Sequence, residues 1–541
     1  MGRGAGRMSV DLVRVRAGAY HDSVTLMRVS RTAADLPGVE VALVAMATGL
    51  NRGVAADLGF GLPEAGPGDL LVALRGEDPA ALETAAAELD RLLAGLASRT
   101  AGGGDGGPAG LDGPGGFGGF GGFGDPGGFG GAAGFAPRTV GAAARALAAD
   151  PGPALALVSV PGPYAFTEAM DAIEAGLPVM IFSDNVPVEQ EVLLKRRAAE
   201  RDVLVMGPDC GTAVIGGTGL GFANVLRPGP VGMVAASGTG AQQVACLLDL
   251  AGVGVRHVLG VGGRDLSAEV GGLSTLRALA ALDADPATEL IVLVSKPPAP
   301  EVARTVRDAA AGLATPVVSA LLGPGSGDLT AAAESALRAL GVPAPAWPSW
   351  PAPGPAGRKA GDGGAREPGD GTGEPGGAAT APPATAEAGG PTGSGGTARR
   401  NGAALHGLYA GGTLCAEARL VAGAGRFTDF GDDAYTRGRA HPMIDPTLRL
   451  EALAGVPGGD VALLDVVLGH GADPDPARRL APAVAAAVAR GTAVVVTLVG
   501  TEGDPQGLGG QTEALRAAGA AVFASNARAA RHAAALAAGA R

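Results

Sequence analysis

The sequence predicts an α/β protein made of several domains with parallel sheets, preceded by a small α+β module. Two observations predict this class. Over 154–323 and again over 460–523, apolar runs of strand length alternate with amphipathic runs of helix length. The strand-length runs are apolar throughout, which is typical of strands that helices cover on both faces. This β-α-β-α order indicates flavodoxin-like or Rossmann-like, doubly wound domains.

The composition limits the partners and the compartment. The 541 residues carry a formal net charge of −12, which argues against a general nucleic-acid binder, because phosphate neutralisation needs a basic surface. Cys210, Cys246 and Cys415 lie far apart, without the spacing of metal ligands, and fit a reducing cytosol. The sequence shows neither a signal peptide nor an uninterrupted apolar run of about 18 residues. We therefore expect a cytoplasmic protein without a metal site or a membrane span.

Residues 8–100 predict the N-terminal α+β module. Strand and helix patterns follow in the order β-α-β-β-α, with the last helix over 78–98, and this order is ferredoxin-like. His21, Asp22 and Ser23 stand at the start of the first helix and offer groups that bind ligands. Asp22 or Ser23 as the N-cap of that helix is the interpretation that we favour.

Two low-complexity segments separate the predicted domains. Residues 101–136 contain the repeat GGFGGFGGFGDPGGFGG, and residues 343–400 are rich in Pro, Gly, Ala, Ser and Thr without periodicity. Neither segment can bury enough apolar surface to become ordered, so both are predicted to be flexible linkers. The remaining chain divides into α/β units at 137–226, 227–342 and 401–541.

The strongest candidate site lies within 203–265. The apolar run 231–235 is followed by Ser237-Gly238-Thr239-Gly240, and a helical pattern begins directly after it. The glycines let the backbone approach an anion, the two hydroxyls add donors, and the helix contributes the positive end of its dipole. No lysine follows, so the turn is not a P-loop. A phosphate or carboxylate cradle is the favoured interpretation, and a tight structural turn is the alternative.

Two further strand ends carry glycine turns with a functional side chain. Arg264, in the turn 260–265, has a planar fork that matches a carboxylate or a phosphate; its alternative is a solvent-exposed loop position. His470, between Gly469 and Gly471, is sterically accessible and suits a nucleophile or an acid–base group near neutral pH. The alternative for His470 is a hydrogen bond to its own loop.

Other polar positions give weaker signals. His441, Asp445 and Arg449 cluster in HPMIDPTLR, but a metal site there would need more ligands than the sequence offers. The segment GLYAGGTLCAEARLV provides another glycine turn before a helix. The strand ends at 161–163, at 184–185 and at 207–210, which includes Asp209, fall where parallel sheets bind ligands.

Several motifs together resemble a known enzyme. The segments VSVPGPYAFTEAMDAIEAGLPVMIFSDNVP, MGPDCGTA, GMVAASGTGAQQ and GVGGRD are similar to the α subunit of succinyl-CoA synthetase. The segments DVALLDVVLGHGADPDP and VVVTLVGTEGDPQG look like the carboxyl-terminal domain of its β subunit. One chain that carries both, with this N-terminal module, GLYAGGTLCAEA and HPMIDPTLR, resembles the FdrA family of acyl-CoA-synthetase-like proteins.

The resemblance implies the identity of the three α/β units and one composite site. Residues 137–226 correspond to a partial CoA-binding domain, and 227–342 and 401–541 to two ligase domains. In the synthetase, helix N-termini of two such ligase domains hold the phosphate of a phosphohistidine. By resemblance, Ser237, Gly238 and Thr239 supply one half of a phosphate site, and the turn at 469–472 supplies the other half.

The chain also departs from the synthetase pattern. Pro324-Gly325-Ser326-Gly327 replaces the loop of the phosphorylated histidine, and Gln243 replaces the glutamate that orients it. The glycine-rich first half of the CoA-binding domain is absent, and we expect no ATP-grasp domain in this chain. Nucleotide-driven CoA ligation by the chain alone is therefore not expected.

The FdrA family is associated with oxamate carbamoyltransferase in allantoin and purine breakdown, together with partner subunits. The resemblance therefore implies an acyl or carbamoyl phosphate at the junction of the two ligase domains. Arg264 would bind the substrate carboxylate, and His470 would act in proton transfer. Neither CoA nor ATP is needed for that reaction.

Two alternatives to a carbamoyltransferase subunit stay open. A homo-oligomer is possible in each case. One is a non-catalytic scaffold subunit. The other is a CoA ligase, for which the resemblance places the CoA contacts at Pro161, Gly162, Pro163, Asp184 and Asn185.

Overall fold

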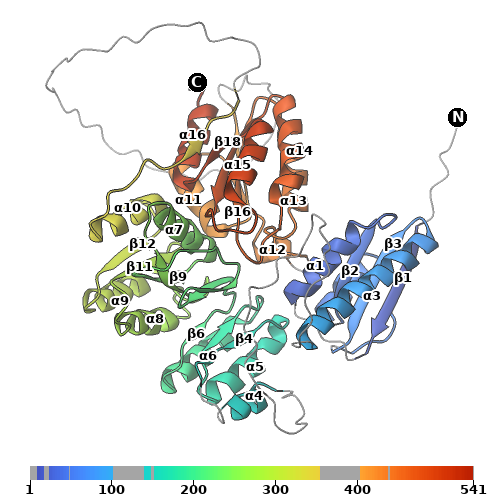
Figure 1. Cartoon of the computed structure of the whole chain (residues 1–541), viewed down its shortest axis with the longest axis horizontal. Helices are drawn as coiled ribbons and strands as arrows, with labels where there is room; N and C mark the ends of the chain where they lie inside the picture. Colours follow the sequence, from blue (N-terminus) through green and yellow to red (C-terminus); the bar gives the residue numbers. More distant parts are fainter. Residues whose placement is uncertain are drawn as a thin grey trace, which may run out of the picture.

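The computed structural model describes residues 9–17, 23–47, 49–66, 68–101, 139–147, 152–353, 403–436 and 439–539. Within these residues the chain forms four sheets, and Figure 1 shows them as separate coloured bodies along the sequence. His21, Asp22, residues 102–136 of the predicted first linker and residues 354–400 of the second lie outside the described residues. The predicted N-cap at the first helix is therefore not described.

The N-terminal module has an antiparallel sheet in the order β1-β3-β2 with α3 packed against it. Leu82, Leu89 and Leu93 of α3 are buried, as their spacing on one helix face predicts. The helix α2 was not expected from the sequence. The elements are β1 (Val10–Arg16), α1 (Ser23–Ala34), β2 (Val41–Met46), α2 (Gly49–Asp57), β3 (Leu70–Gly76) and α3 (Pro79–Ala101).

The first α/β domain is a three-stranded parallel sheet in the order β4-β5-β6. Val179, Met180 and Ile181 of the central strand are completely buried, as their apolar run predicts. The elements are α4 (Val140–Leu147), β4 (Ala156–Val158), α5 (Gly162–Glu174), β5 (Val179–Ile181), α6 (Val188–Glu200) and β6 (Val205–Met206).

The second α/β domain has six strands in the order β12-β11-β9-β10-β7-β8. Its β9 to β12 are parallel, whereas the hairpin β7–β8 joins the edge of β10 in antiparallel pairing. The hairpin lies in the range that the sequence analysis gave to the first unit, and its pairing with β10 attaches it to the second sheet. The elements are β7 (Thr212–Ile215), β8 (Thr218–Gly221), β9 (Val231–Ala236), α7 (Gly238–Leu250), β10 (Val255–Gly260), α8 (Leu273–Asp283), β11 (Leu290–Ser295), α9 (Pro300–Ala311), β12 (Val317–Leu321) and α10 (Leu329–Ala339).

The third α/β domain has six strands in the order β13-β18-β17-β16-β14-β15, all parallel except β13. Residues 343–353, placed in the second linker by composition, are described: Trp347 is buried, and β13 pairs with β18. The elements are β13 (Ser349–Trp350), β14 (Leu405–Tyr409), α11 (Gly412–Ala422), β15 (Arg426–Asp429), α12 (Asp433–Thr436), α13 (Thr447–Ala454), β16 (Val461–Val467), α14 (Pro476–Ala489), β17 (Ala493–Val499), α15 (Leu508–Ala517), β18 (Ala521–Phe523) and α16 (Asn526–Ala537).

A continuous hydrophobic core joins the second and third α/β domains. Helix α7 packs against α10 and α11, and α16 packs against α10 and α11, so α7 and α11 lie side by side (Figure 1). Leu247 and Leu337 from one domain and Leu414 and Ala530 from the other are fully buried in this core. Because each large apolar side chain contributes roughly 1.5–3 kcal/mol on burial, the two domains form one stable unit. Among the described residues no helix could span a membrane.

Candidate functional site

The Ser237 turn lies where the sequence predicts it, between the buried strand β9 and helix α7. Ser237 is the N-cap of α7, and its hydroxyl accepts a hydrogen bond from Gly240 N at 3.0 Å. The same hydroxyl donates to Thr413 Oγ1 at 2.6 Å, which is a contact with the third α/β domain. Gly238 approaches Thr212 so closely that a Cβ there would lie 3.1 Å from the Thr212 hydroxyl. The turn therefore lies at the junction of the second and third domains.

The partner of the Ser237 turn is the first turn of α11. A Cβ at Gly411 would lie 2.6 Å from Thr239 Oγ1, so the two glycine turns are in direct contact. Buried Asp465 on β16 holds this turn, because its carboxylate accepts hydrogen bonds from Ala410 N at 2.7 Å and Gly411 N at 2.8 Å. The N-termini of α7 and α11 thus face each other, and the positive ends of both helix dipoles meet there.

The turn that the resemblance implied as the second half makes other contacts. His470 N donates to Ala223 O at 2.8 Å, and Ala223 N donates to His470 O at 3.2 Å. Gly469 has a φ of 113°, and a Cβ on it would meet Ala223 O at 2.5 Å, so glycine is required for this close approach. Gln506 also binds the backbone of Gly469 through both ends of its amide. The turn therefore joins the chain after β8 to the third domain, with the His470 side chain half-buried beside Asp504.

Arg264 lies at the seam between the first and second α/β domains. Its guanidinium donates to Glu191 Oε2 at 3.0 Å and to Val186 O at 2.7 Å. Glu191 in turn accepts from the ammonium of buried Lys195, which also binds Asp265 at 2.7 Å. The guanidinium remains partly exposed, with 44% of the side-chain surface accessible. The cation that the sequence assigned to a substrate carboxylate thus pairs with a carboxylate of the chain itself.

The two segments proposed for CoA lie against each other. A Cβ on Gly162, the first residue of α5, would lie 2.2 Å from Asp184 O and 2.7 Å from Asn185 O. Pro161 is the N-cap residue of this helix, and Pro163 follows in its first turn. The loops after β4 and β5 therefore meet at one edge of the first sheet, as the parallel order of the strands requires.

Three charged residues lie at the junction, and of these the sequence analysis named only Asp209, among the strand ends of the parallel sheet. Lys296 follows β11, Asp429 ends β15, and Asp209 is in the loop after β6. Burial raises the pKa of Asp209 to about 7 and the pKa of Asp429 to about 6, while the charge of Lys296 acts to lower both. The available signal was position, since each residue stands at the carboxyl end of a strand.

Gln243, for which the resemblance implies a glutamate in the synthetase, connects the second and third α/β domains. Its amide donates to Ala524 O at 3.0 Å and accepts from Asn526 N at 3.0 Å, and the side chain is completely buried. The segment 324–327, where the resemblance implies the histidine loop of the synthetase, is a turn and irregular chain before the N-cap Asp328 of α10.

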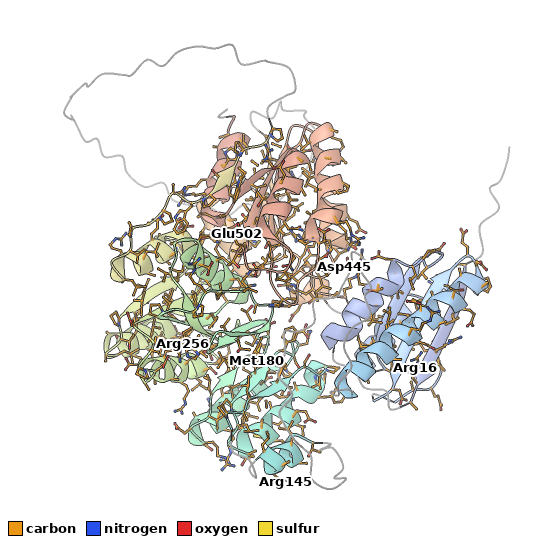
Figure 2. The ribbon with its side chains drawn as sticks, viewed as in Figure 1. Arg16, Arg145, Met180, Arg256, Asp445 and Glu502 are labelled. Atoms are coloured by element: carbon orange, nitrogen blue, oxygen red, sulfur yellow. The ribbon has the colours of Figure 1, made fainter. Side chains whose placement is uncertain are left out.

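The three residues predicted to cluster in HPMIDPTLR have different surroundings. Arg449 is buried and pairs with Asp465 at 3.1 Å. Asp445 binds Arg31 of the N-terminal module at 2.9 Å and Arg479 at 3.0 Å, and Figure 2 places Asp445 on the side of the third domain that faces this module. Burial lowers the pKa of His441 to about 4.

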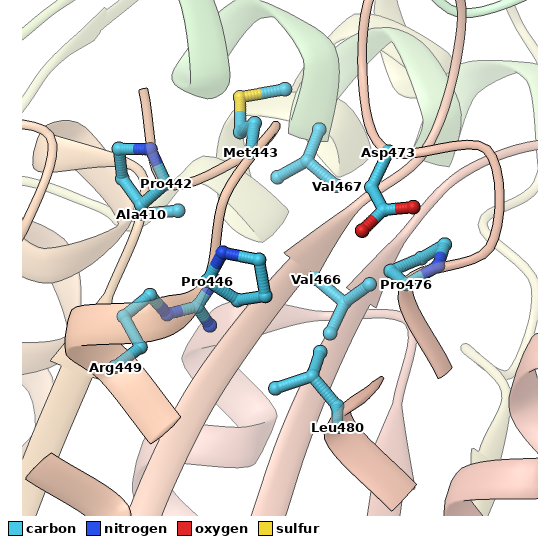
Figure 3. Close-up of a pocket in the computed structure, with 10 residues that line it drawn as sticks. All are labelled: Ala410, Pro442, Met443, Pro446, Arg449, Val466, Val467, Asp473, Pro476 and Leu480. Atoms are coloured by element: carbon cyan, nitrogen blue, oxygen red, sulfur yellow. The ribbon is translucent and has the colours of Figure 1, made fainter. Parts of the chain in front are cut away.

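The same region contains a small cavity (Figure 3). Its volume is about 20 Å³, which is room for about one water molecule. Among the described residues no group of three or more His, Cys, Asp and Glu side chains is arranged to hold a metal ion. The residues that line the cavity are Ala410, Pro442, Met443, Pro446, Arg449, Val466, Val467, Asp473, Pro476 and Leu480.

Two family models match the chain. The model described as "AllF, heavy metal-associated domain" matches residues 8–108, and the model described as "CoA-ligase" matches residues 408–536. The first matched segment contains no cysteine. The second begins in β14 and includes α11, Asp429 and the turn around His470.

Parts of the chain are also similar to a CoA ligase subunit and to a solved acetyl-coenzyme A synthetase. The α subunit 2 of succinate–CoA ligase [ADP-forming] from Archaeoglobus fulgidus is 32% identical over 144 residues, 26% of this chain and 49% of that protein. The acetyl-coenzyme A synthetase 1 of Ca. Korarchaeum cryptofilum, solved with phosphate and ADP, is 16% identical, and the match covers 71% of this chain and 82% of that one. Its TM-score of 0.25 is too low to support an argument about the site.

The match to YahF spans nearly the whole chain. The protein described as "Uncharacterized protein YahF" from Escherichia coli is 34% identical over 564 residues, 96% of this chain and 97% of that protein. A full-length match at this identity includes the N-terminal module and all three α/β domains. The chain therefore belongs to the FdrA-type family of succinyl-CoA-synthetase-like proteins, together with YahF.

Proposed function

We propose that this protein is an acyl-group-transfer subunit that holds the phosphoryl group of an acyl or carbamoyl phosphate between the first turns of α7 and α11. The observation that carries the proposal is the pair of facing helix N-termini, joined by the hydrogen bond from Ser237 to Thr413 at 2.6 Å. Backbone N–H groups at two helix starts suit an anion. Gly411 allows the close approach of Thr239 that brings the two helix starts together, and Gly238 allows the close approach of Thr212.

The chemistry that suits this arrangement is acyl or carbamoyl transfer to or from phosphate. Fixed N–H donors and helix dipoles stabilise negative charge that develops on a tetrahedral intermediate, without any reorganisation of the protein. We propose oxamate or oxalurate carbamoyl transfer in the cytoplasm, together with partner subunits, as the reaction of this site. Arg264 then binds the substrate carboxylate by leaving Glu191, and His470 moves the proton.

The test is calorimetric titration of the purified chain with carbamoyl phosphate, acetyl phosphate and CoA. The wild-type chain should bind carbamoyl or acetyl phosphate. Gly411→Ala should weaken this binding about tenfold or more, because its Cβ would lie 2.6 Å from Thr239 Oγ1 and push the two turns apart. Gly510→Ala, at a helix position where a Cβ meets no atom within 4 Å, is the matched control and should bind like the wild type. A wild-type chain that binds neither acyl phosphate contradicts the proposal.

A CoA ligase is the second candidate, because the loops at Gly162 and Asp184 meet in one place beside a helix N-terminus. A binding signal in the calorimetric titration with CoA would favour this candidate. Binding of carbamoyl phosphate without binding of CoA would favour the carbamoyl reaction. A chain that binds none of these ligands would fit the scaffold subunit instead.

A further inference from the structure

Lys296 occupies a position that none of the functional assignments above uses. It directly follows β11, and β11 is the neighbour of β9 in the second sheet, so its loop lies beside the Ser237 turn. Its ammonium extends to the third domain, because a Cβ on Gly412 would lie 3.0 Å from Lys296 Nζ. The same Cβ would lie 2.3 Å from Asp429 Oδ2. The first turn of α11 therefore has an ammonium and a carboxylate on the same side.

The environment of Lys296 differs from that of the other described lysine. Lys195 is buried, and its ammonium donates to Glu191 at 2.8 Å, to Val261 O at 2.9 Å and to Asp265 at 2.7 Å. The Lys296 side chain is exposed, and it makes no hydrogen bond or close ion pair with another residue that the structure describes. Lys195 therefore has a structural role, whereas the ammonium of Lys296 is available to an external anion.

The carboxylates around Lys296 come from two other domains. Asp209 comes from the first α/β domain. The positive charges of Lys296 and Arg264 lower its pKa, and the negative charges of Asp184 and Asp433 raise it. Asp429 comes from the third domain. The positive charge of Lys296 lowers its pKa, and the negative charges of Asp465 and Asp432 raise it. An anion that binds Lys296 competes with Asp209 and Asp429 for the same ammonium, so its binding raises the cost of keeping both carboxylates charged.

We propose that Lys296 is the cation that binds the dianionic phosphoryl group at the first turn of α11, and that this binding is coupled to uptake of one proton by Asp429. The inference rests on the proposed function, since it assigns a charge to the phosphate site described there. It also narrows the ligand class to dianions, because a single ammonium beside two helix N-termini discriminates in favour of higher negative charge.

The sign of the pH dependence follows from the competition for the ammonium. In the free protein the pKa of Asp429 is about 6. The bound anion raises this pKa further, so the complex holds a proton that the free protein has lost. The gain in affinity is complete below the pKa that Asp429 has in the free protein, and it is lost as the pH rises through the higher pKa that Asp429 has in the complex. Affinity for a dianion should therefore increase as the pH falls from about 8 to about 5.

The experiment is calorimetry with sulfate, which stays a dianion over this pH range, and with carbamoyl phosphate in parallel. Lys296→Gln should weaken binding of both anions about tenfold or more, the effect expected for loss of a charged hydrogen-bond donor. Arg304→Gln, on the exposed face of α9, is the matched control and should bind like the wild type. Titration of sulfate in two buffers of different ionisation enthalpy should show proton uptake by the wild type and a smaller uptake by Asp429→Asn, in which only Asp209 responds to the anion.

The outcomes separate this inference from the proposed function. If the wild type binds carbamoyl phosphate and Lys296→Gln binds it equally well, Lys296 is not the cation and only the inference fails. Proton uptake that is missing from the wild type, or unchanged in Asp429→Asn, overturns the coupling, and so does a wild type that binds carbamoyl phosphate but not sulfate. A wild type that binds neither anion overturns both the inference and the proposed function.

Discussion

His441 is a histidine that the fold keeps neutral. Its Nδ1 accepts a hydrogen bond from Met443 N at 3.3 Å, and its ring centroid lies 5.5 Å from that of Phe222. A Cβ on Gly431 would lie 2.9 Å from Nε2, so the ring is enclosed on that side as well. Burial lowers its pKa from 6.5 to about 4, and the positive charge of Arg449 adds to the effect. A residue so far from its ordinary pKa links the stability of the third domain to pH.

His441→Gln should remove a pH dependence of stability. The unfolded chain takes up a proton on this histidine below about pH 6.5, whereas the folded protein does so only near pH 4. The free energy of unfolding should therefore fall by up to about 3 kcal/mol as the pH decreases from about 6.5 to about 4. Denaturant unfolding at several pH values, compared with the variant, measures this difference. At pH 8 His441 is neutral in both the folded and the unfolded protein, so the difference in unfolding free energy between wild type and variant at this pH is the reference. If that difference stayed the same at lower pH, the prediction would be contradicted.

At the residue scale, the sequence predicted the Ser237 turn because glycine and hydroxyl residues after an apolar run are a local signal. It did not predict Lys296 or Asp429, whose meaning depends on which strand ends lie side by side in space. The turn at His470 gave the same local signal as the Ser237 turn. In the structure its glycines serve a close approach to Ala223, which sequence spacing cannot distinguish from a ligand site.

Helix α16 begins at Asn526, whose side chain is the buried centre of a hydrogen-bond network within the third domain. Its side chain donates to Leu414 O at 2.9 Å and to Glu417 Oε2 at 2.7 Å. It accepts from Tyr409 at 3.1 Å and from Thr497 at 3.0 Å. Because the side chain is completely buried, water cannot replace these bonds when it is removed.

Asn526→Ala should therefore destabilise the third domain by about 2–4 kcal/mol, since several buried donors and acceptors lose their partners at once. Thermal unfolding followed by calorimetry measures this loss. Thr305→Ala, on the exposed face of α9, provides the control and should change the stability by less than about 0.5 kcal/mol. An effect of Asn526→Ala no larger than that of the control would show that the network contributes little to the stability of the third domain.

At the element scale, the central strands were predictable because helices cover both of their faces. The residues of β9, β11 and β16 are all buried, and their sequences are apolar except for Ser295 at the end of β11 and Asp465 within β16. The hairpin β7–β8 was not predicted, because Thr218-Gly219-Leu220-Gly221 has neither periodicity nor β-branched runs. Strand β13 is two residues long and pairs with the edge of β18, and such a short strand has no periodicity that a sequence could reveal.

At the scale of the whole molecule, the candidate site depends on three domains at once. Asp209 comes from the first α/β domain, Lys296 from the second and Asp429 from the third. No single domain contains the complete set of groups, so a change in the arrangement of the domains changes the site. The shared core fixes the second domain against the third, and the Lys195, Glu191 and Asp265 network fixes the first against the second.

The N-terminal module is joined to this assembly through Arg31. The Arg31 guanidinium donates to Asp445 at 2.9 Å and to Thr447 at 3.3 Å, and Arg479 binds the same Asp445 and Thr447 from the third domain. Burial raises the pKa of Asp445, but the Thr447 hydroxyl and the two arginines outweigh burial, so the net pKa is lowered. The side chains are only partly exposed, at 21% for Arg31 and 27% for Asp445, so salt screens the pair less than a surface pair.

Arg31→Ala should loosen the docking of the module without unfolding it, because a partly exposed ion pair contributes about 1 kcal/mol and the module has its own core. Small-angle scattering of the full chain should show a larger radius of gyration for Arg31→Ala, and high salt should shift the wild type toward the same value. Arg197→Ala removes an ion pair with Glu174 inside one domain and should leave the radius of gyration unchanged. Equal radii for Arg31→Ala and the wild type at low salt would show that other contacts hold the module in place, and Asp445 would then act only within the third domain.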